Sequence, residues 1–328
     1  MTSTTCPACH HSAIRAWLSN QVFRSADAEF HFELLGCDDC GLGFVYPEPS
    51  LAQLATFYPP DYQPYETVPE SPQAIAHSFK YRVARMRHAR DAVRPTRHLE
   101  ILLGAAVEYA TGKTVSYSLG LPLQLPRDAR ILELGYGSGS WLLSMAALGY
   151  HQLHGYDIAS NDRQAVALTQ AGVEVTSGSF LDNNYPAGSF DCIRLEHVFE
   201  HLIDPLRVLT KLHSLLKPGG RLVMNLPCID SWSVRVSLRH FPHLDVPRHL
   251  YHHTGRSLTL LLEAAGFRAL RRKSYADAAS LAGAVNGLLG ERFRAAVPMQ
   301  LFRAVAPAYK LACQWTRKGD LVTLTAVR

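Results

Sequence analysis

The sequence predicts a doubly wound α/β fold with a largely parallel sheet, preceded by a small cysteine-containing module. From residue 129 onward, short apolar segments typical of buried strands alternate with amphipathic segments typical of helices, and glycines stand between them. Repeated βα units of this kind form a parallel sheet with helices on both faces. The chain has 328 residues, of which 47% are hydrophobic and 19% charged, so it can bury a sizeable core.

Four cysteines near the start of the chain form two C-x-x-C pairs. The first pair is CPAC, with Cys6 and Cys9, and the second is CDDC, with Cys37 and Cys40. Each pair can direct two sulfurs toward one point, and two pairs complete the tetrahedral thiolate site that Zn²⁺ prefers. Because all four positions are then filled by protein, we interpret the zinc as structural. Unbound or redox-active thiols are the alternative.

The segment between the two cysteine pairs is rich in β-forming residues and is interrupted by SADAE, so it predicts a β-hairpin. A short hairpin buries little apolar surface, and metal binding would therefore supply part of its folding energy. We expect a zinc-ribbon module at residues 1–46 and a helical linker or cap at 47–128. Within the linker, Ser50 can cap a short helix, and residues 73–110 show helical periodicity.

The elements of the α/β domain, expected at 129–328, follow from hydrophobic pattern and from turn residues. The expected strands lie at 130–134, 152–158, 173–178, 190–196 and 221–227. The first two expected helices lie at 140–149 and 162–172. A third begins where Asp204 can act as N-cap and Pro205 occupies the first turn. Its apolar residues recur at helical spacing: Leu206, Leu209, Leu212 and Leu216.

The loop ELGYGSGS carries glycines at alternate positions: Gly135, Gly137 and Gly139. This spacing differs from the dinucleotide fingerprint G-x-G-x-x-G, and the loop lacks the terminal G-K-[ST] of a phosphate-binding P-loop. Glu133 precedes the glycines, where a carboxylate would repel a pyrophosphate but suit a cation. Asp157 ends the next strand, where it can accept hydrogen bonds from two ribose hydroxyls. A ligand with a ribose, no phosphate and a cationic end is S-adenosyl-L-methionine (SAM).

The chain resembles the class I SAM-dependent methyltransferases over roughly residues 129–328. ILELGYGSGSWL resembles their first motif, GYDI the acidic second motif, and GSFLD the loop that brackets adenine. The stretch FDCIRLEHVFEHLIDPLRVLTKLHSLLKPGGRLVMNLP resembles the fourth and fifth strands with the helix between them, and GDLVTLTAVR resembles the final strand. The resemblance implies a Rossmann-like sheet of seven strands, the last antiparallel, with a helical insertion at about 276–318.

The same resemblance implies a site for the SAM cofactor. Gly135 and Gly137 would line the methionine part, Asp157 would bind the ribose, and Ser179 with Phe180 would contact the adenine. Neighbouring residues complete the expected cofactor-binding set: Glu133, Tyr136, Ile158 and Leu195.

The segment after the fourth strand bears on the methyl acceptor. RLEHVFEH stands where amino-base methyltransferases carry [DN]-P-P-[YF], which argues against amino methylation of DNA bases. Four N-terminal cysteines ahead of a class I domain resemble the C-methyltransferases that act on nucleotide-linked deoxysugars. In those enzymes a histidine within a YxEHLSYFS-like segment acts near the acceptor carbon. The matching stretch here is VPRHLYHHT, in which His249 takes the histidine position and Arg248 replaces the glutamate.

Two histidines are the predicted catalytic residues. A histidine with a pKa near neutrality is the natural base for removing an acceptor proton, and we assign this role to His249. His197 follows the fourth strand and is expected to position the acceptor. His197, Glu200 and His201 are spaced at i, i+3 and i+4, so on a helix they would share one face and could bind a metal. Packing or capping histidines are the alternative reading of this spacing.

The sequence as a whole predicts an enzyme that transfers a methyl group from SAM to oxygen or carbon of a small-molecule acceptor, a sugar or other secondary metabolite. A zinc-ribbon RNA methyltransferase and a non-catalytic SAM-binding partner protein are the alternatives. The formal net charge of +5 is a weak indication of nucleic acid.

Location and assembly are predicted from apolar segments. No apolar run reaches the ~18 residues of a membrane span, and the first residues do not read as a secretory signal, so the expected location is the cytoplasm. The apolar segment 276–318 is expected to form helices that cover the acceptor pocket or that pair two subunits in a homodimer. A helix lying on a membrane surface is the alternative.

Overall fold

The computed structural model describes residues 4–24, 29–58, 125–158, 162–236, 238–241, 243–276, 282, 285 and 299–328. These residues form two compact units. The ribbon unit draws on Met1–Tyr62, His197–His213 and Met224–Arg328, and the loop unit draws on Gln63–Glu196 and Ser214–Val223. Most of the expected linker at 47–128, including the expected helix at 73–110, lies outside the described residues, as does much of the first half of the expected insertion at 276–318.

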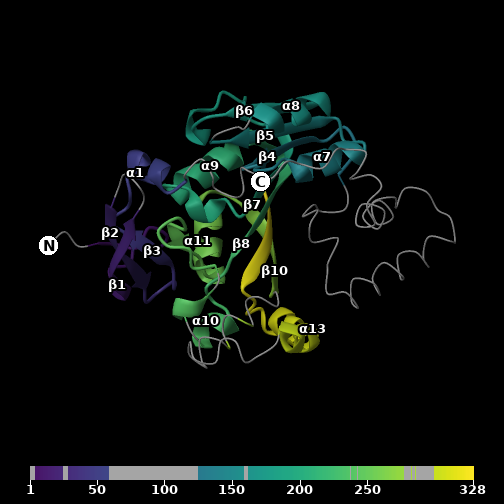
Figure 1. Cartoon of the computed structure of the whole chain (residues 1–328). Coiled ribbons are helices and arrows are strands. Elements are labelled where there is room, and N and C mark those ends of the chain that lie inside the picture. Colours follow the sequence, from purple (N-terminus) through teal and green to yellow (C-terminus); the bar gives the residue numbers. More distant parts are fainter. Residues whose placement is uncertain are drawn as a thin grey trace. The chain divides into compact units, whose positions relative to one another are not determined.

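The larger sheet has seven strands in the order β10-β11-β8-β7-β4-β5-β6 (Figure 1). In chain order the strands are β4 (Arg130–Leu134), β5 (Gln152–Asp157), β6 (Val173–Ser177), β7 (Phe190–Glu196), β8 (Leu216–Pro227), β10 (Arg268–Tyr275) and β11 (Leu321–Val327). β4 pairs in parallel with β5 and β7, and β5 pairs in parallel with β6, whereas β10 and β11 are antiparallel. The predicted Rossmann-like sheet of seven strands with an antiparallel last strand is therefore confirmed.

The helices follow the strands in the predicted alternation. They are α7 (Ser140–Ala147), α8 (Asp162–Gln170), α9 (Pro205–Leu215), α10 (Trp232–Val236), α11 (Gly255–Ala264) and α13 (Met299–Thr316). Three 3₁₀ turns lie between them: η1 (Phe180–Asp182), η2 (Phe199–His201) and η3 (Leu238–His240). One expected helical residue is placed differently, because Leu216 begins β8 and α9 ends one residue before it.

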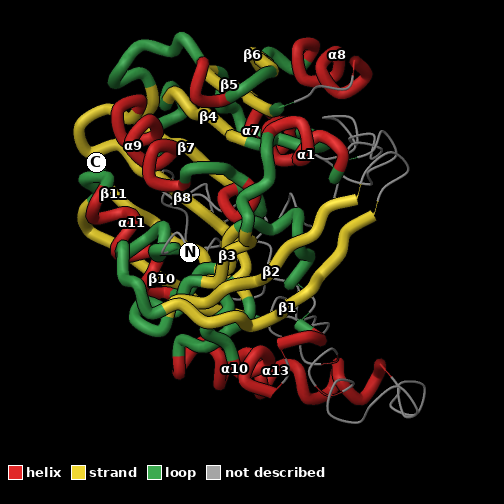
Figure 2. The backbone as a smooth tube through the Cα atoms, turned by 90° about the vertical axis from the view of Figure 1, so that its left-hand side faces the viewer, coloured by secondary structure: helices red, strands yellow, loops and turns green. Residues whose placement is uncertain are grey.

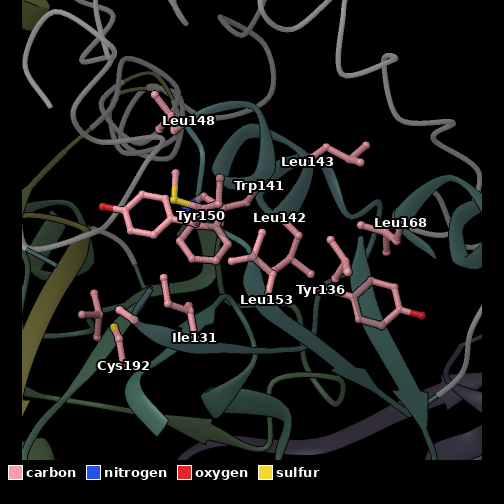
Figure 3. Close-up of a cluster of buried hydrophobic side chains, with 14 residues drawn as sticks. Ile131, Tyr136, Trp141, Leu142, Leu143, Leu148, Tyr150, Leu153, Leu168 and Cys192 are labelled. Atoms are coloured by element: carbon pink, nitrogen blue, oxygen red, sulfur yellow. The ribbon is translucent and has the colours of Figure 1, made fainter. Parts of the chain in front are cut away.

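The core of the loop unit packs side chains of α7 against the parallel strands. Figure 3 shows Trp141 and Leu142 from α7 together with Ile131 from β4 and Leu153 from β5. Leu142 and Ile131 have no solvent-accessible surface. Because α7 is packed against the strands, the position of the glycine-containing loop that joins β4 to α7 is restricted at both ends.

The ribbon unit contains a second, four-stranded sheet in the order β1-β2-β3-β9, all antiparallel. Its strands are β1 (Ile14–Arg24), β2 (Glu29–Cys37), β3 (Gly43–Tyr46) and β9 (Tyr251–His252), and the first three run side by side in Figure 2. The predicted hairpin between the cysteine pairs is confirmed as β1 and β2. The fourth strand comes from a segment about two hundred residues later in the chain, which no local pattern indicates.

The ribbon unit also contains α1 (Leu51–Thr56) and α13. α1 follows Ser50, whose Oγ accepts from the Gln53 amide at 3.3 Å, as expected of a helix cap. α13 occupies the last part of the apolar segment expected at 276–318, and exposes Leu311 and Trp315. Among the described residues, no helix combines the length and apolarity that crossing a bilayer requires.

Gly139 supports a test of how closely the loop approaches α8. Its φ is +73°, and a Cβ there would lie 2.8 Å from Leu168 Cδ1, whereas a Cβ at Gly149, with φ +90°, would meet no atom of the described residues within 4 Å. We expect Gly139→Ala to lower the free energy of unfolding by at least about 2 kcal/mol, since it suffers both backbone strain and overpacking. Gly149→Ala should lower it by only about 1 kcal/mol, because the strain is partly offset by reduced freedom of the unfolded chain. Equal losses in urea denaturation would show that the contact with Leu168 does not restrict this position.

Candidate functional site

The glycine loop joins the end of β4 to the start of α7, and its backbone amides bind neighbouring groups of the loop unit. Gly135 N donates to Tyr156 O at 2.7 Å, and Gly137 N donates to Asp157 Oδ2 at 2.9 Å. All three loop glycines have φ between +49° and +73°, a region that other residues rarely adopt. A Cβ added at Gly137 would meet no atom of the described residues within 4 Å, so none of them occupies the space beside this glycine.

Asp157 lies at the end of β5 with a carboxylate held by two backbone amides. Its Oδ2 accepts from Gly137 N, and its Oδ1 accepts from Ile158 N at 2.8 Å. The structure thus brings Gly135, Gly137 and Asp157 together where two adjacent parallel strands end, which is where ligands bind in open α/β sheets.

The residues predicted to contact adenine follow β6, next to the end of β5. Gly178 N donates to Asp157 O at 2.9 Å and joins the ends of the two strands. The Tyr156 hydroxyl donates to Ser179 O at 2.9 Å, and the Phe180 ring packs edge-on against Tyr156 with the ring centroids 5.6 Å apart. Ser179 and Phe180 therefore lie next to the end of β5, in contact with Tyr156, within the same unit.

Glu133 has a partner that the sequence analysis missed. It is almost fully buried and accepts a hydrogen bond from Arg194 Nη1, while Arg194 Nη2 donates to Glu196 Oε2 at 2.7 Å. The Arg194 guanidinium also lies 4.5 Å from the centroid of the Trp141 ring. Burial raises the pKa of the Glu133 carboxyl, and the adjacent guanidinium opposes this rise. The arginine in the middle of the predicted buried strand FDCIRLE was the available signal, because a buried cation requires a buried partner.

The remaining predicted cofactor residues lie around this loop with different exposures. Tyr136, within the loop, and Leu195, which pairs with Leu134 in the sheet, are buried at 5% and 1% exposure, so their side chains belong to the core. Ile158 is 71% exposed, and its backbone amide, rather than its side chain, contacts Asp157.

In the ribbon unit, His197 and Glu200 lie close together just after the end of β7. His197 has a φ of +52°, its amide donates to Asn225 O at 2.8 Å, and its Nδ1 lies 3.5 Å from Glu200 Oε1. The His197 side chain is 38% exposed, whereas that of Glu200 is 1% exposed. Burial raises the pKa of Glu200, but the neighbouring imidazoles outweigh burial and lower it to about 2, so the carboxyl is ionised at neutral pH.

His249 approaches the same carboxylate from the loop before β9. Its Nδ1 lies 2.8 Å from His243 O, and its Nε2 lies 4.0 Å from Glu200 Oε1. Leu250 N donates to Glu200 O at 2.8 Å, which fixes this loop beside η2. Burial lowers the pKa of His249 to about 4, so the imidazole is neutral at pH 7. The structure therefore places both predicted catalytic histidines around one buried carboxylate.

The expected helical face of His197, Glu200 and His201 is not formed as such. η2 is a single 3₁₀ turn that begins after His197, so the three residues do not follow α-helical geometry. Instead, Glu200 and His201 gather with His249, and the ligand-capable atoms of these three lie within 4.8 Å of one another.

The four N-terminal cysteines form a compact cluster in the ribbon unit. The Sγ atoms of Cys6 and Cys40 are 3.5 Å apart, those of Cys9 and Cys37 are 3.6 Å apart, and all four lie within 4.8 Å of one another. Zn–S bonds of ~2.3 Å in a tetrahedron place the sulfurs about 3.8 Å apart. The cluster therefore fits a tetrahedral zinc ion.

The second cysteine pair is held by residues from the far end of the chain. Thr254 Oγ1 donates to Cys40 O at 2.7 Å, and the same hydroxyl caps α11 by accepting from Ser257 N at 3.0 Å. Arg256 Nη2 donates to both carboxylate oxygens of Asp39 at 3.0 Å. The sequence T-x-x-S indicates the helix cap, whereas the hydrogen bond to Cys40 joins residues that are distant in the sequence.

Comparison with known proteins gives one family and several partial relatives. A family model described as a methyltransferase domain matches residues 107–271, half of the chain. A ubiquinone biosynthesis O-methyltransferase of Xanthomonas axonopodis pv. citri is 31% identical over 140 residues, which are 41% of this chain and 54% of that protein. A ribosomal protein L11 methyltransferase of Bordetella parapertussis is 34% identical over 142 residues, 42% of this chain and 44% of that protein.

Among solved structures, a SAM-dependent methyltransferase of Thermotoga maritima, described as a possible histamine N-methyltransferase, is 16% identical with a TM-score of 0.44. The alignment covers 69% of this chain and 95% of that one. The chain spans about half the length of the curated relatives it matches. Since the family model covers half of the chain, and the matched region contains the glycine loop, Asp157 and the parallel strands that position them, the protein belongs to the methyltransferase domain family.

Proposed function

We propose that the protein transfers a methyl group from SAM to oxygen or carbon of a small-molecule acceptor such as a sugar or another secondary metabolite. The observation that supports this most is the Asp157 carboxylate at the end of β5, which Gly137 N and Ile158 N orient beside the glycine loop. A ribose diol supplies two hydroxyl donors for this carboxylate. A pyrophosphate would be repelled by the same carboxylate, which favours a nucleoside without phosphates.

The other predicted cofactor residues fit the same orientation of SAM. The space beside Gly137 would admit the methionine part, with Gly135 on the same loop. Ser179 and Phe180 would contact the adenine, since they follow β6 next to the end of β5. Glu133 would act through Arg194 and the loop backbone rather than by direct contact, because its side chain is buried against the guanidinium.

Methyl transfer is an in-line displacement at the methyl carbon of the sulfonium. The new bond forms between the acceptor atom and the methyl carbon, the bond from carbon to sulfur breaks, and S-adenosylhomocysteine leaves. A hydroxyl or carbon-acid acceptor must also lose a proton, for which a neutral imidazole is suited. In this proposal His249 accepts the proton through Nε2, because its Nδ1 faces the His243 carbonyl and carries the ring proton.

We also propose a structural role for the cysteine cluster and a subunit contact for α13. The cysteine cluster would hold one structural Zn²⁺, because four thiolates fill a tetrahedral site and leave no position for substrate. A homodimer through α13 is favoured by the exposure of Leu311 and Trp315 on that helix.

Two alternatives have distinguishable outcomes. The L11 methyltransferase resembled by this chain and the zinc ribbon of some RNA methyltransferases favour a macromolecular acceptor. RNA binding would weaken steeply as the salt concentration rises, whereas binding of an uncharged small acceptor would not. A non-catalytic SAM-binding protein would bind SAM without turning over any acceptor.

The ribose assignment predicts a specific loss of cofactor affinity. Asp157→Ala should weaken SAM binding by about 1.5–3 kcal/mol, the range for a hydrogen bond to a charged group. Isothermal titration calorimetry with SAM measures this directly, and NAD should not bind to either form. The exposed Asp128 of the same unit supplies the matched control, since Asp128→Ala should bind SAM like the wild type. Unchanged affinity in Asp157→Ala would exclude the ribose role.

The zinc assignment predicts linked losses of metal and stability. Elemental analysis should find one zinc per chain in the wild type, and Cys37→Ser should lose both the metal and part of the unfolding free energy. Cys313→Ser, which changes a buried cysteine of α13 far along the sequence, should keep its zinc. A metal-free protein with a normal unfolding transition would rule out a structural zinc.

The proton-transfer assignment predicts an ordered effect of two substitutions. His249→Ala should lower kcat by about 10²–10⁴, the range for general acid–base catalysis, while SAM affinity changes little. His197→Ala should lower kcat less, since we assign it a positioning role. Single-turnover methyl transfer measures both, with His213→Ala of α9 as the matched control. If His197→Ala abolishes transfer and His249→Ala does not, the exposed His197 is the base instead.

A further inference from the structure

We propose that Glu200, His201 and His249 form a second metal site, which binds a divalent first-row transition-metal ion and is separate from the cysteine cluster. The three side chains belong to the ribbon unit, and their ligand-capable atoms lie within 4.8 Å of one another. The inference concerns metal binding alone and does not rest on methyl transfer.

Both histidines are oriented as metal-binding histidines are. Nδ1 of His201 lies 3.0 Å from the backbone oxygen of Arg248, and Nδ1 of His249 lies 2.8 Å from that of His243. A carbonyl oxygen only accepts hydrogen bonds, so Nδ1 carries the proton in each neutral ring and Nε2 carries the lone pair. In a metal-bound histidine, the ring nitrogen that does not bind the metal usually donates a hydrogen bond to a carbonyl or carboxylate. This bond holds the ring in one tautomer and one orientation.

The carboxylate of Glu200 supplies the charge that a cation would offset. Its side chain is 1% exposed, and neither oxygen has a hydrogen-bond partner among the described residues. The nearest polar atoms given by the structure are imidazole nitrogens, at 3.5 Å on His197 and 4.0 Å on His249. A buried carboxylate without hydrogen bonds is strongly unfavourable unless it is paired or coordinates a metal.

Contacts outside the three ligands hold them in place. Leu250 N donates to the backbone oxygen of Glu200 at 2.8 Å, which ties the His249 loop to the turn that carries Glu200 and His201. The Tyr58 hydroxyl lies 2.9 Å from His201 Nδ1 and shares this nitrogen's proton with the Arg248 carbonyl. The His201 and His249 rings meet edge to face, with centroids 4.6 Å apart. The ligand set is therefore fixed by backbone and side-chain contacts before an ion arrives.

The ligand types decide which ions the site would take. Two imidazole nitrogens and one carboxylate favour iron, cobalt, nickel or zinc over Mg²⁺ and Ca²⁺, which prefer oxygen ligands. Three protein ligands leave coordination positions for water or another small ligand, unlike the closed cysteine site. Because the same Nε2 lone pair cannot both bind an ion and accept a proton, a bound ion would prevent His249 from acting as a base.

Cobalt titration tests this site in the full-length protein. The starting material is protein with one zinc per chain, shown by elemental analysis. Isothermal titration calorimetry should then detect one equivalent of Co²⁺, with visible d–d absorption and no near-ultraviolet thiolate-to-cobalt charge-transfer band. Failure to bind one equivalent of Co²⁺ in addition to the zinc, or appearance of the thiolate band, would overturn the proposal.

Variants test whether the bound Co²⁺ is held by Glu200, His201 and His249. Glu200→Gln, which preserves the side-chain shape, and His201→Ala should each weaken Co²⁺ binding by more than about 100-fold, since even loss of an outer contact costs about 10–100-fold. Tyr58→Phe should weaken it by about 10-fold through loss of the contact at His201 Nδ1. His213→Ala is the matched control and should bind Co²⁺ normally. Retention of one zinc and of the wild-type unfolding transition shows that each variant is folded; folded variants of Glu200 and His201 that bind Co²⁺ like the wild type would refute the site.

Discussion

The hydrogen bond that Asp157 accepts from Gly137 N holds the glycine loop against the end of β5, and the bond from Ile158 N orients the carboxylate for it. The loop brings the Gly137 amide to the carboxylate with its glycines at positive φ, and Gly139 in addition leaves room for Leu168 of α8. The strand ends are joined at the same place, where Gly135 N binds Tyr156 O and Gly178 N binds Asp157 O. A carboxylate fixed in this way needs little reorganisation to bind a diol, which favours affinity.

Local patterns were sufficient to predict the alternation of strands and helices. β4 and β7 begin and end at the predicted residues, because each is a short apolar segment bounded by turn residues. Contacts between distant segments were not predictable in the same way. β9 has only two residues, and it pairs with a strand about two hundred residues earlier in the chain. Neither segment has a sequence pattern that indicates this pairing. The Arg194–Glu133 pair had a visible signal, a cation within a buried strand, but its partner could be identified only from the register of β4 beside β7.

The histidines show the same division between residue identity and environment. The sequence singled out His249 and His197 and gave a helical reason for grouping His197 with Glu200 and His201. That reason was wrong in its geometry, because a 3₁₀ turn begins after His197, yet Glu200 does lie beside both predicted histidines. What joins them is the hydrogen bond from Leu250 N to Glu200 O, between residues fifty positions apart. Such a bond leaves no mark in composition or periodicity.

The two clusters of the ribbon unit are suited to different metal chemistry for a physical reason. Four thiolates are soft, strongly donating ligands that fill a tetrahedron. Backbone hydrogen bonds and the Thr254 cap of α11 hold the two C-x-x-C turns in place. Two imidazoles and a carboxylate are harder ligands, carry one negative charge in place of four, and leave positions open. An ion in the cysteine cluster would therefore stay bound as long as the protein is folded. An ion in the second cluster would exchange with the solvent, and its occupancy would follow the concentration of free metal.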